Sequence, residues 1–282
     1  MPDAEVAQPA TGKPARRSRR LLERLHAPLL VTSGAGVALL IVMALGASKP
    51  PPRVLTQKDI DAAVLKTLET KPLPSRAAQA YELIRGAVVR VRGLGGEGEA
   101  DKDVERSVGT GVVILDNGTI LTNLHVVSGA KRLSVIFSDG LEAEATIVGA
   151  RAEHDLAVIR AKTVPDDLQP ATLRSTADLR LGDEVVAAGF PFGIGPSVSF
   201  GVISGLRREY QSPEGKRLLT NLIQFDAAAN PGSSGGPLFT TDGEVVGIVT
   251  GILNPNKEAV FIGIGFAVPI ENAASAVGVS PF

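Results

Sequence analysis

The sequence at residues 109–127 reads GTGVVILDNGTILTNLHVV and gives the clearest indication of the fold class. Two apolar runs flank the turn Asp116-Asn117-Gly118, and an Asn-Gly step between such runs is a strong hairpin signal. Val, Ile and Thr on both sides of the turn favour strands. The stretch therefore predicts a β-hairpin whose second arm ends close to His125.

Similar short β-rich runs continue outward from this hairpin, from Ala87 to Pro269. Turn residues separate them, for example Ser138-Asp139-Gly140 and Thr241-Asp242-Gly243. About eleven or twelve strands with few helices between them favour antiparallel β-barrels. We therefore expect an all-β body.

Two short helices are predicted before this body. Residues 57–69 place Ile60, Val64 and Leu68 four residues apart, which is the spacing of an amphipathic helix. Residues 75–86 predict a second short helix. Between the two, prolines interrupt the helical pattern.

Residues 27–47 contain no charged side chain, and about 20 such residues suffice for a helix to cross a bilayer. Arginines are concentrated between residues 16 and 24, so the positive-inside rule places the N-terminus in the cytoplasm. We predict a single-pass protein of the inner (cytoplasmic) membrane whose body is periplasmic or otherwise extracytoplasmic. The predicted segments are a basic cytoplasmic tail (1–26), a transmembrane anchor (27–47), a linker with a short helix (48–74) and the folded body (75–282). A cleaved signal peptide with its apolar region at 36–47 remains the alternative.

Composition excludes several classes of function. Residues 54–282 carry 21 basic and 27 acidic side chains, a net charge of −6 that gives no support to a nucleic-acid partner. The absence of cysteine excludes disulfides, thiolate metal sites and a cysteine nucleophile. The three histidines lie far apart and form no metal-binding motif, and no phosphate-binding glycine loop is present. We therefore predict neither a metal nor a cofactor.

The segment at residues 230–238 reads NPGSSGGPL and suggests nucleophilic chemistry at Ser234. A serine hydroxyl is a weak nucleophile that needs a neighbouring base, together with backbone N–H groups directed at the developing oxyanion. Glycines around the serine allow the sharp turn that presents those amides. By itself, such a Gly/Ser segment is more often a surface turn.

The histidines decide between these interpretations. His26 abuts the apolar segment, His125 ends an apolar run, and His154 directly precedes Asp155. A buried structural histidine and a turn-capping aspartate explain His125 and Asp155 singly, but not the order His, Asp, Ser across strand-rich segments. An α/β-hydrolase, which also uses a G-x-S-x-G turn, needs a histidine after the serine, and none follows residue 154.

The segments TNLHVV, HDLAVI and NPGSSGGPL resemble the three active-site segments of the HtrA/Deg family of trypsin-like serine proteases, and the resemblance covers residues 107–270. It implies two perpendicular six-stranded antiparallel barrels of the chymotrypsin type, with the active site in the cleft between them. It further implies that 75–282 is a serine protease domain acting on unfolded or exposed polypeptides through an acyl-enzyme intermediate.

Residue roles follow from the same resemblance. Ser234 would be the nucleophile and His125 its base, while Asp155 would fix the tautomer of His125 and stabilise its cationic form. The backbone N–H groups of Gly232 and Ser234 would form the oxyanion hole. Ser233 and Leu124 replace the asparagines common in the family at these positions, and neither position supplies a catalytic atom.

The resemblance also assigns a specificity pocket to Ala228, Ile248, Val249 and Thr250. Since none is charged, cleavage after small or medium apolar residues is expected. Arg208 lies at the spacing of a family arginine that orders the oxyanion hole, although a solvated surface arginine explains it equally well.

The same resemblance leads to expectations about oligomeric state and regulatory domains. Family members trimerise through the region equivalent to 75–92, which predicts a possible homotrimer. Only 13 residues follow Pro269, so no PDZ module is expected within this chain. The competing hypothesis is a catalytically silent protease fold that serves as a scaffold or peptide-binding module.

Overall fold

The computed structural model describes residues 16–47, 55–71, 73–95, 104–211, 217–253 and 260–277. The first part of the predicted basic tail and the proline-rich spacer at 48–54 lie outside these ranges. The chain divides into two compact units, Met1–Pro72 and Leu73–Phe282. The predicted start of the folded body, residue 75, lies two residues after the observed division.

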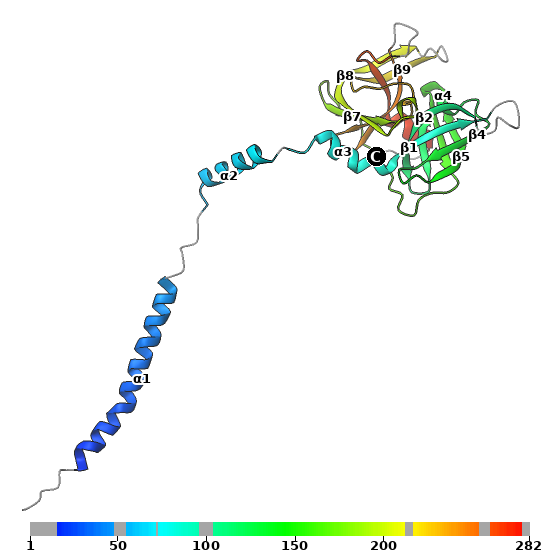
Figure 1. Cartoon of the computed structure of the whole chain (residues 1–282). Helices are drawn as coiled ribbons and strands as arrows, with labels where there is room; N and C mark the ends of the chain where they lie inside the picture. Colours follow the sequence, from blue (N-terminus) through cyan, green and yellow to red (C-terminus); the bar gives the residue numbers. More distant parts are fainter. Residues whose placement is uncertain are drawn as a thin grey trace, which may run out of the picture. The chain divides into compact units, whose positions relative to one another are not determined.

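The first unit contains two helices (Figure 1), α1 (Arg16–Ala47) and α2 (Gln57–Thr70). The anchor predicted over 27–47 falls within α1, and large apolar side chains there, such as Leu40 and Val42, are exposed. Among the residues that the structure describes, however, no helix is long and apolar enough to span a bilayer, and the predicted anchor is not confirmed.

A capping box at Thr56 explains where α2 begins. The Thr56 hydroxyl accepts a hydrogen bond from the Asp59 N–H (3.3 Å), and the Asp59 carboxylate accepts one from the Thr56 N–H (2.9 Å). The helix predicted over 57–69 is thus present and one residue longer. Its apolar positions Ile60, Val64 and Leu68 are exposed.

The second unit begins with α3 (Arg76–Ile84) and a 3₁₀ turn, η1 (Arg85–Ala87), which match the helix predicted over 75–86. Two closed barrels of six antiparallel strands follow, in the orders β1-β2-β3-β6-β5-β4 and β10-β11-β12-β9-β8-β7. The first barrel contains β1 (Val88–Leu94), β2 (Glu105–Leu115), β3 (Thr119–Asn123), β4 (Arg132–Ile136), β5 (Glu142–Arg151) and β6 (Leu156–Ala161). The second contains β7 (Glu184–Gly189), β8 (Ser197–Gln211), β9 (Leu218–Phe225), β10 (Pro237–Thr240), β11 (Val245–Ile252) and β12 (Gly265–Pro269).

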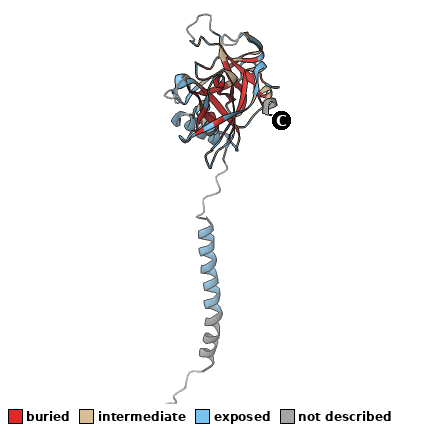
Figure 2. Ribbon diagram, turned by 90° about the vertical axis from the view of Figure 1, so that its right-hand side faces the viewer, coloured by how far each residue is buried: buried red, intermediate tan, exposed pale blue. Residues whose placement is uncertain are grey.

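The predicted hairpin is the β2–β3 pair, in which Val112 lies opposite Leu121 and Val113 opposite Ile120. The two closed six-stranded barrels confirm the all-β body, while their perpendicular arrangement stays a prediction. Figure 2 shows the buried residues gathered in the strands of both barrels. One apolar cluster fills the first barrel and continues into the second, for example from Ile120 and Leu121 to Phe239 and Ile248.

The last helix, α5 (Ile270–Val277), ties the two barrels together. It follows directly from β12 of the second barrel and packs against β5 and β6 of the first. Its Glu271 carboxylate accepts hydrogen bonds from the backbone N–H (2.6 Å) and hydroxyl (2.9 Å) of Thr176 and from the Ser175 hydroxyl (3.1 Å), in the connection between the barrels. The relative position of the barrels is therefore fixed by polar contacts as well as by the shared core.

Candidate active site

His125 and Asp155, the predicted base and the residue predicted to orient it, lie together in the first barrel. His125 lies in the short helix α4 (Leu124–Val127), directly after β3. Its Nδ1 is 2.5 Å from Asp155 Oδ2, and its backbone N–H donates to Asp155 Oδ1 at 3.0 Å. The carboxylate therefore fixes both the backbone and the ring of His125 through Nδ1, and Nε2 is the ring nitrogen that Asp155 does not contact.

Asp155 is held in an uncommon backbone conformation. It ends the 3₁₀ turn η3 (Ala152–His154) with φ 53° and ψ 37°, the left-handed region that Asp tolerates better than most residues. Its carbonyl oxygen accepts hydrogen bonds from the Leu124 N–H (2.9 Å) and from Asn123 Nδ2 (3.1 Å). These bonds connect the turn before β6 to the segment that carries His125, so the two residues are positioned as one unit.

Thr250 supplies a third donor to the Asp155 carboxylate. Its hydroxyl donates to Asp155 Oδ2 at 3.1 Å, across from β11 in the second barrel. Sequence reasoning assigned Thr250 to the wall of a specificity pocket and missed this contact. Burial of a carboxylate is tolerated when its oxygens accept hydrogen bonds, and here the donors come from both barrels.

The predicted nucleophile occupies a tight turn before β10. The Ser233 N–H donates to the Asn230 carbonyl (2.8 Å), and the Gly236 N–H donates to the Ser233 carbonyl (3.0 Å). The Ser233 side chain is buried, and its hydroxyl accepts from the Asn230 N–H at 3.3 Å. Ser233 thus serves the turn itself, and Ser234 remains half-buried at its apex.

Close packing brings this turn against the segment that leads to His125. The Ser234 carbonyl accepts a hydrogen bond from the Thr110 N–H of β2 at 2.8 Å. Gly235 has φ +86°, and a β-carbon there would lie 2.1 Å from the Thr110 carbonyl oxygen and 3.2 Å from the Asn123 nitrogen. Only glycine fits at position 235, and the contact places the Ser234 turn beside the end of β3, two residues before His125.

The backbone around Gly232 has a defined orientation. The Pro231 carbonyl accepts a hydrogen bond from the Phe192 N–H (2.7 Å), in the 3₁₀ turn η4 (Pro191–Gly193). Because the C=O and N–H of a trans peptide point in opposite directions, the Gly232 N–H is directed away from Phe192. Within the described part of the chain, neither the Gly232 nor the Ser234 N–H donates a hydrogen bond. The two N–H groups predicted to form an oxyanion hole thus have no acceptor among the described residues.

The other residues predicted for the specificity pocket are not equivalent in the structure. Ala228 is exposed, and its carbonyl accepts from the Ser199 hydroxyl at 2.7 Å. Ile248 and Val249 are almost completely buried and pack in the apolar cores. Thr250 is also buried, and its hydroxyl bonds to Asp155. Of the four residues, only Ala228 is exposed.

Within the part of the chain that the structure describes, Arg208 makes no hydrogen bond to the turn that carries Ser234. It lies within β8, and its Nε donates to Gln224 Oε1 on the neighbouring strand β9 at 2.9 Å. Arg208 is exposed, as a solvated surface arginine would be, and its role in ordering the oxyanion hole stays a prediction.

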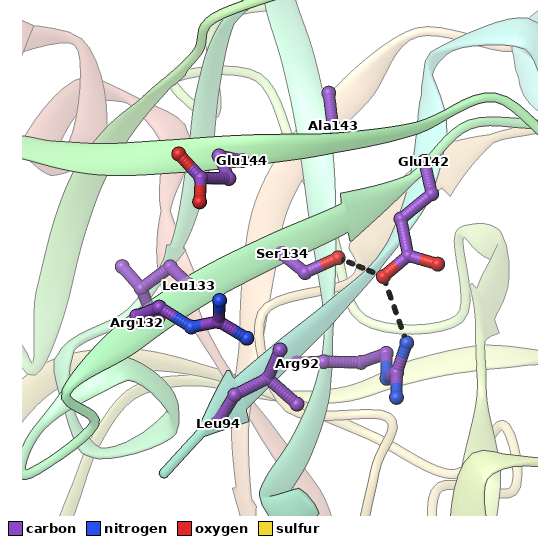
Figure 3. Close-up of a pocket in the computed structure, with 8 residues that line it drawn as sticks. All are labelled: Arg92, Leu94, Arg132, Leu133, Ser134, Glu142, Ala143 and Glu144. Atoms are coloured by element: carbon purple, nitrogen blue, oxygen red, sulfur yellow. Dashed lines mark hydrogen bonds and ion pairs between the residues drawn. The ribbon is translucent and has the colours of Figure 1, made fainter. Parts of the chain in front are cut away.

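A separate hollow of about 320 Å³ lies on the outer face of the first barrel, lined by residues of β1, β4 and β5 (Figure 3). Glu142 accepts hydrogen bonds there from Ser134 (2.6 Å) and Arg92 (2.9 Å). The hydrogen bond from Lys162 and its positive charge hold the pKa of Glu144 below its ordinary value. None of the residues that line this hollow was predicted for the active site. The ion pairs of Glu142 and Glu144 indicate that the hollow is part of the charged surface of the barrel.

Sequence reasoning missed the residues that support the site. Thr110, Asn123 and Phe192 hold Ser234, Asp155 and Pro231 through the bonds given above. The one available signal was the pair of glycines that flank Thr110, since glycines inside a strand often mark a close approach of another backbone.

Comparisons with known proteins identify relatives of this chain. The family model of the trypsin-like peptidase domain matches residues 109–248. A probable periplasmic serine endoprotease DegP-like from Halomonas elongata is 41% identical over 179 residues, which cover 64% of this chain and 36% of that protein. The periplasmic pH-dependent serine endoprotease DegQ of Escherichia coli is 36% identical over 220 residues, 72% of this chain and 47% of DegQ.

Solved structures give the same result. The HtrA-type protease AlgW, solved with a tripeptide, superposes with a TM-score of 0.63 and 36% identity, covering 73% of this chain and 63% of that one. The chain thus spans between a third and a half of the length of the two curated relatives given above.

Proposed function

Since the chain belongs to the HtrA (Deg) group of trypsin-like serine proteases, we propose that it is a serine endopeptidase with Ser234 as its nucleophile. The observation that carries the proposal is the pair of bonds between Asp155 and His125, beside a glycine turn that presents Ser234. The relatives' names identify serine endoproteases, which act on polypeptides, and we extend that substrate class to this chain.

In the proposed reaction, Ser234 Oγ attacks the scissile carbonyl while His125 Nε2 accepts the hydroxyl proton. Asp155 stabilises the resulting imidazolium. The Gly232 and Ser234 N–H groups stabilise the oxyanion, and the loss of one such donor costs about 3 kcal/mol of barrier in a comparable protease. His125 then protonates the leaving amine, and water hydrolyses the acyl-enzyme by the same route.

For specificity, we propose cleavage of unfolded or exposed polypeptide after small or medium apolar residues. Ala228 supports this because it is exposed, small and uncharged at the position where the family's pocket floor is expected. A library of peptides that differ in the residue before the cleaved bond tests the preference. Efficient cleavage after Lys, Arg or Asp would contradict it.

We also propose a periplasmic location, tethered by residues 27–47, and assembly as a homotrimer. The uncharged run at 27–47 and the preceding arginines support the tether, and the relatives' names support the compartment. Alkaline extraction of membranes tests the tether, and light scattering of the detergent-solubilised chain tests the trimer. Release of the full-length chain at alkaline pH, or a monomeric mass, would contradict the respective proposal.

The catalytic proposal is tested with the full chain in detergent, unfolded casein as substrate, and the variant Ser234→Ala. We expect the wild type to cleave casein and to be labelled on Ser234 by a fluorophosphonate, and the variant to do neither, with its folding unchanged by circular dichroism. Equal failure of wild type and variant in both assays would instead favour a silent protease fold.

A further inference from the structure

Thr110 is completely buried in β2, and every polar atom it has is hydrogen-bonded. Its N–H donates to the Ser234 carbonyl (2.8 Å), and its carbonyl accepts from the Thr122 hydroxyl (2.7 Å). Its own hydroxyl donates to the Gly232 carbonyl (2.7 Å) and accepts from the Phe190 N–H (3.0 Å). One residue of the first barrel thus contacts both residues proposed to bind the oxyanion.

The hydroxyl of Thr110 lies between the two segments that set the direction of the Gly232 N–H. On one side it holds the Gly232 carbonyl, which belongs to the peptide after Gly232 and so fixes the C-terminal side of this residue. On the other it holds the N–H of Phe190, two residues before the Phe192 N–H that fixes the Pro231 carbonyl. Because a hydroxyl donates one hydrogen bond and accepts others, it can serve both partners at once, which a methyl group cannot.

The space around the side chain leaves it little freedom. A β-carbon on Gly189 would lie 2.8 Å from Thr110 Oγ1, and one on Gly236 would lie 3.1 Å from Thr110 Cγ2. β-Branched residues are also restricted at χ1. The hydroxyl is therefore held in one orientation before any substrate arrives.

We propose that Thr110 is a positioning residue of the oxyanion hole, and that its hydroxyl, beyond its bulk, orients the Gly232 N–H. The proposal rests on the proposed function, because it assigns Thr110 a role in that same site. A mispositioned donor costs most in the transition state, where the oxyanion forms, and little in the binding of substrate.

The test compares three variants of the full chain in detergent. Thr110→Val keeps the shape and loses the hydroxyl, and Thr110→Ser keeps the hydroxyl and loses a methyl group. Thr119→Val is the matched control, because Thr119 is equally buried and its hydroxyl bonds only within the first barrel: it donates to Asn117 (2.6 Å) and accepts from Arg160 (3.4 Å). For Thr110→Val we expect a fall in kcat of about 10- to 100-fold with KM within about twofold. We expect Thr110→Ser to recover kcat to within about threefold of wild type, and Thr119→Val to keep it.

A second readout does not depend on catalysis. Hydrogen exchange measured by mass spectrometry should quicken in peptides covering 190–192 and 231–235 of Thr110→Val, and stay unchanged there in Thr119→Val. If the wild type neither cleaves casein nor labels, the proposed function fails, and the exchange measurement alone decides the role of Thr110. Wild-type exchange in Thr110→Val, a kcat equal to wild type, or an equal loss in both valine variants would overturn the proposal.

Discussion

Gly232 shows how tightly single residues are constrained at the site. Its φ is +101°, a region open almost only to glycine, and a β-carbon there would lie 2.4 Å from the Phe190 carbonyl oxygen and 2.9 Å from the Phe192 nitrogen. Its neighbours are backbone atoms, which have little freedom to yield. Backbone conformation and packing both require glycine at this position.

Gly232→Ala is therefore expected to displace the turn that carries Gly232 and Ser234. We predict a fall in kcat/KM of about 10²- to 10³-fold, as for the loss of an oxyanion donor, with folding retained. The measurement is casein cleavage together with the rate of fluorophosphonate labelling. Gly140→Ala is the control, since Gly140 also has a positive φ (+90°) but has no atom within 4 Å of a β-carbon. An equal loss in both variants would mean that backbone strain, and not the turn, sets the effect.

At the residue scale, His125, Asp155 and Ser234 could be predicted because each lies in a short local segment that resembles an active-site segment of the HtrA/Deg family. The contacts of Thr110 and Thr250 were not predictable in the same way. Each depends on a hydrogen bond from a strand of one barrel to a turn of the other, and no local pattern encodes the relative position of the barrels. The side chains of Ile248 and Val249, which were assigned to a pocket wall, pack in the apolar cores, and their assignment to the pocket stays a prediction.

Among the secondary-structure elements, those stabilised by local interactions were predicted best. The β2–β3 hairpin was predicted from its turn sequence and α2 from its apolar spacing, and the structure adds a local capping box at the start of α2. The closure of each barrel, in which β1 pairs with β4 and β7 with β10, joins strands far apart in sequence. Strand number could be estimated from the sequence, but register and strand order could not.

The capping box gives α2 a pH dependence. Hydrogen bonds from the Thr56 hydroxyl and N–H lower the pKa of Asp59 from its ordinary value of 3.8. A lowered folded-state pKa means that the stabilisation is present above the unfolded pKa and is lost as pH falls through the folded value. We predict that acidification below about pH 4 frays the first turn, seen as a shift of the Asp59 and Ile60 Cα resonances toward coil values.

The variants Asp59→Ala and Glu69→Ala test this assignment. Asp59→Ala should have a frayed first turn at every pH, while Glu69→Ala, at the far end of the helix, should keep the wild-type transition. A transition that persists unchanged in Asp59→Ala would assign the titration to another group.

At the scale of the whole molecule, the two barrels depend on each other for the site. Asp155 takes donors from the first barrel and, through Thr250, from the second, while the Ser234 turn of the second barrel is bonded to β2 of the first. Glu271 adds a third link, because α5 leaves the second barrel and packs on the first.

Glu271→Ala is predicted to lower the free energy of unfolding by about 2 kcal/mol, because it leaves the Thr176 N–H and two hydroxyls without their charged acceptor. The measurement is urea unfolding followed by circular dichroism. Glu209→Ala, which removes an exposed glutamate of β8, should stay within about 0.5 kcal/mol of wild type. Equal midpoints for the two variants would show that the α5 link contributes nothing to stability.

The division of the site between the barrels has a consequence for biosynthesis. The base and its carboxylate come from the earlier part of the chain, and the nucleophile comes from the later part, so neither barrel alone holds a working set of groups. Domains generally fold as units during synthesis, the N-terminal one first. Under the proposed function, proteolytic competence arises only when the second barrel has docked. Under the same proposal, a nascent or half-folded chain cannot cleave itself or the unfolded proteins around it.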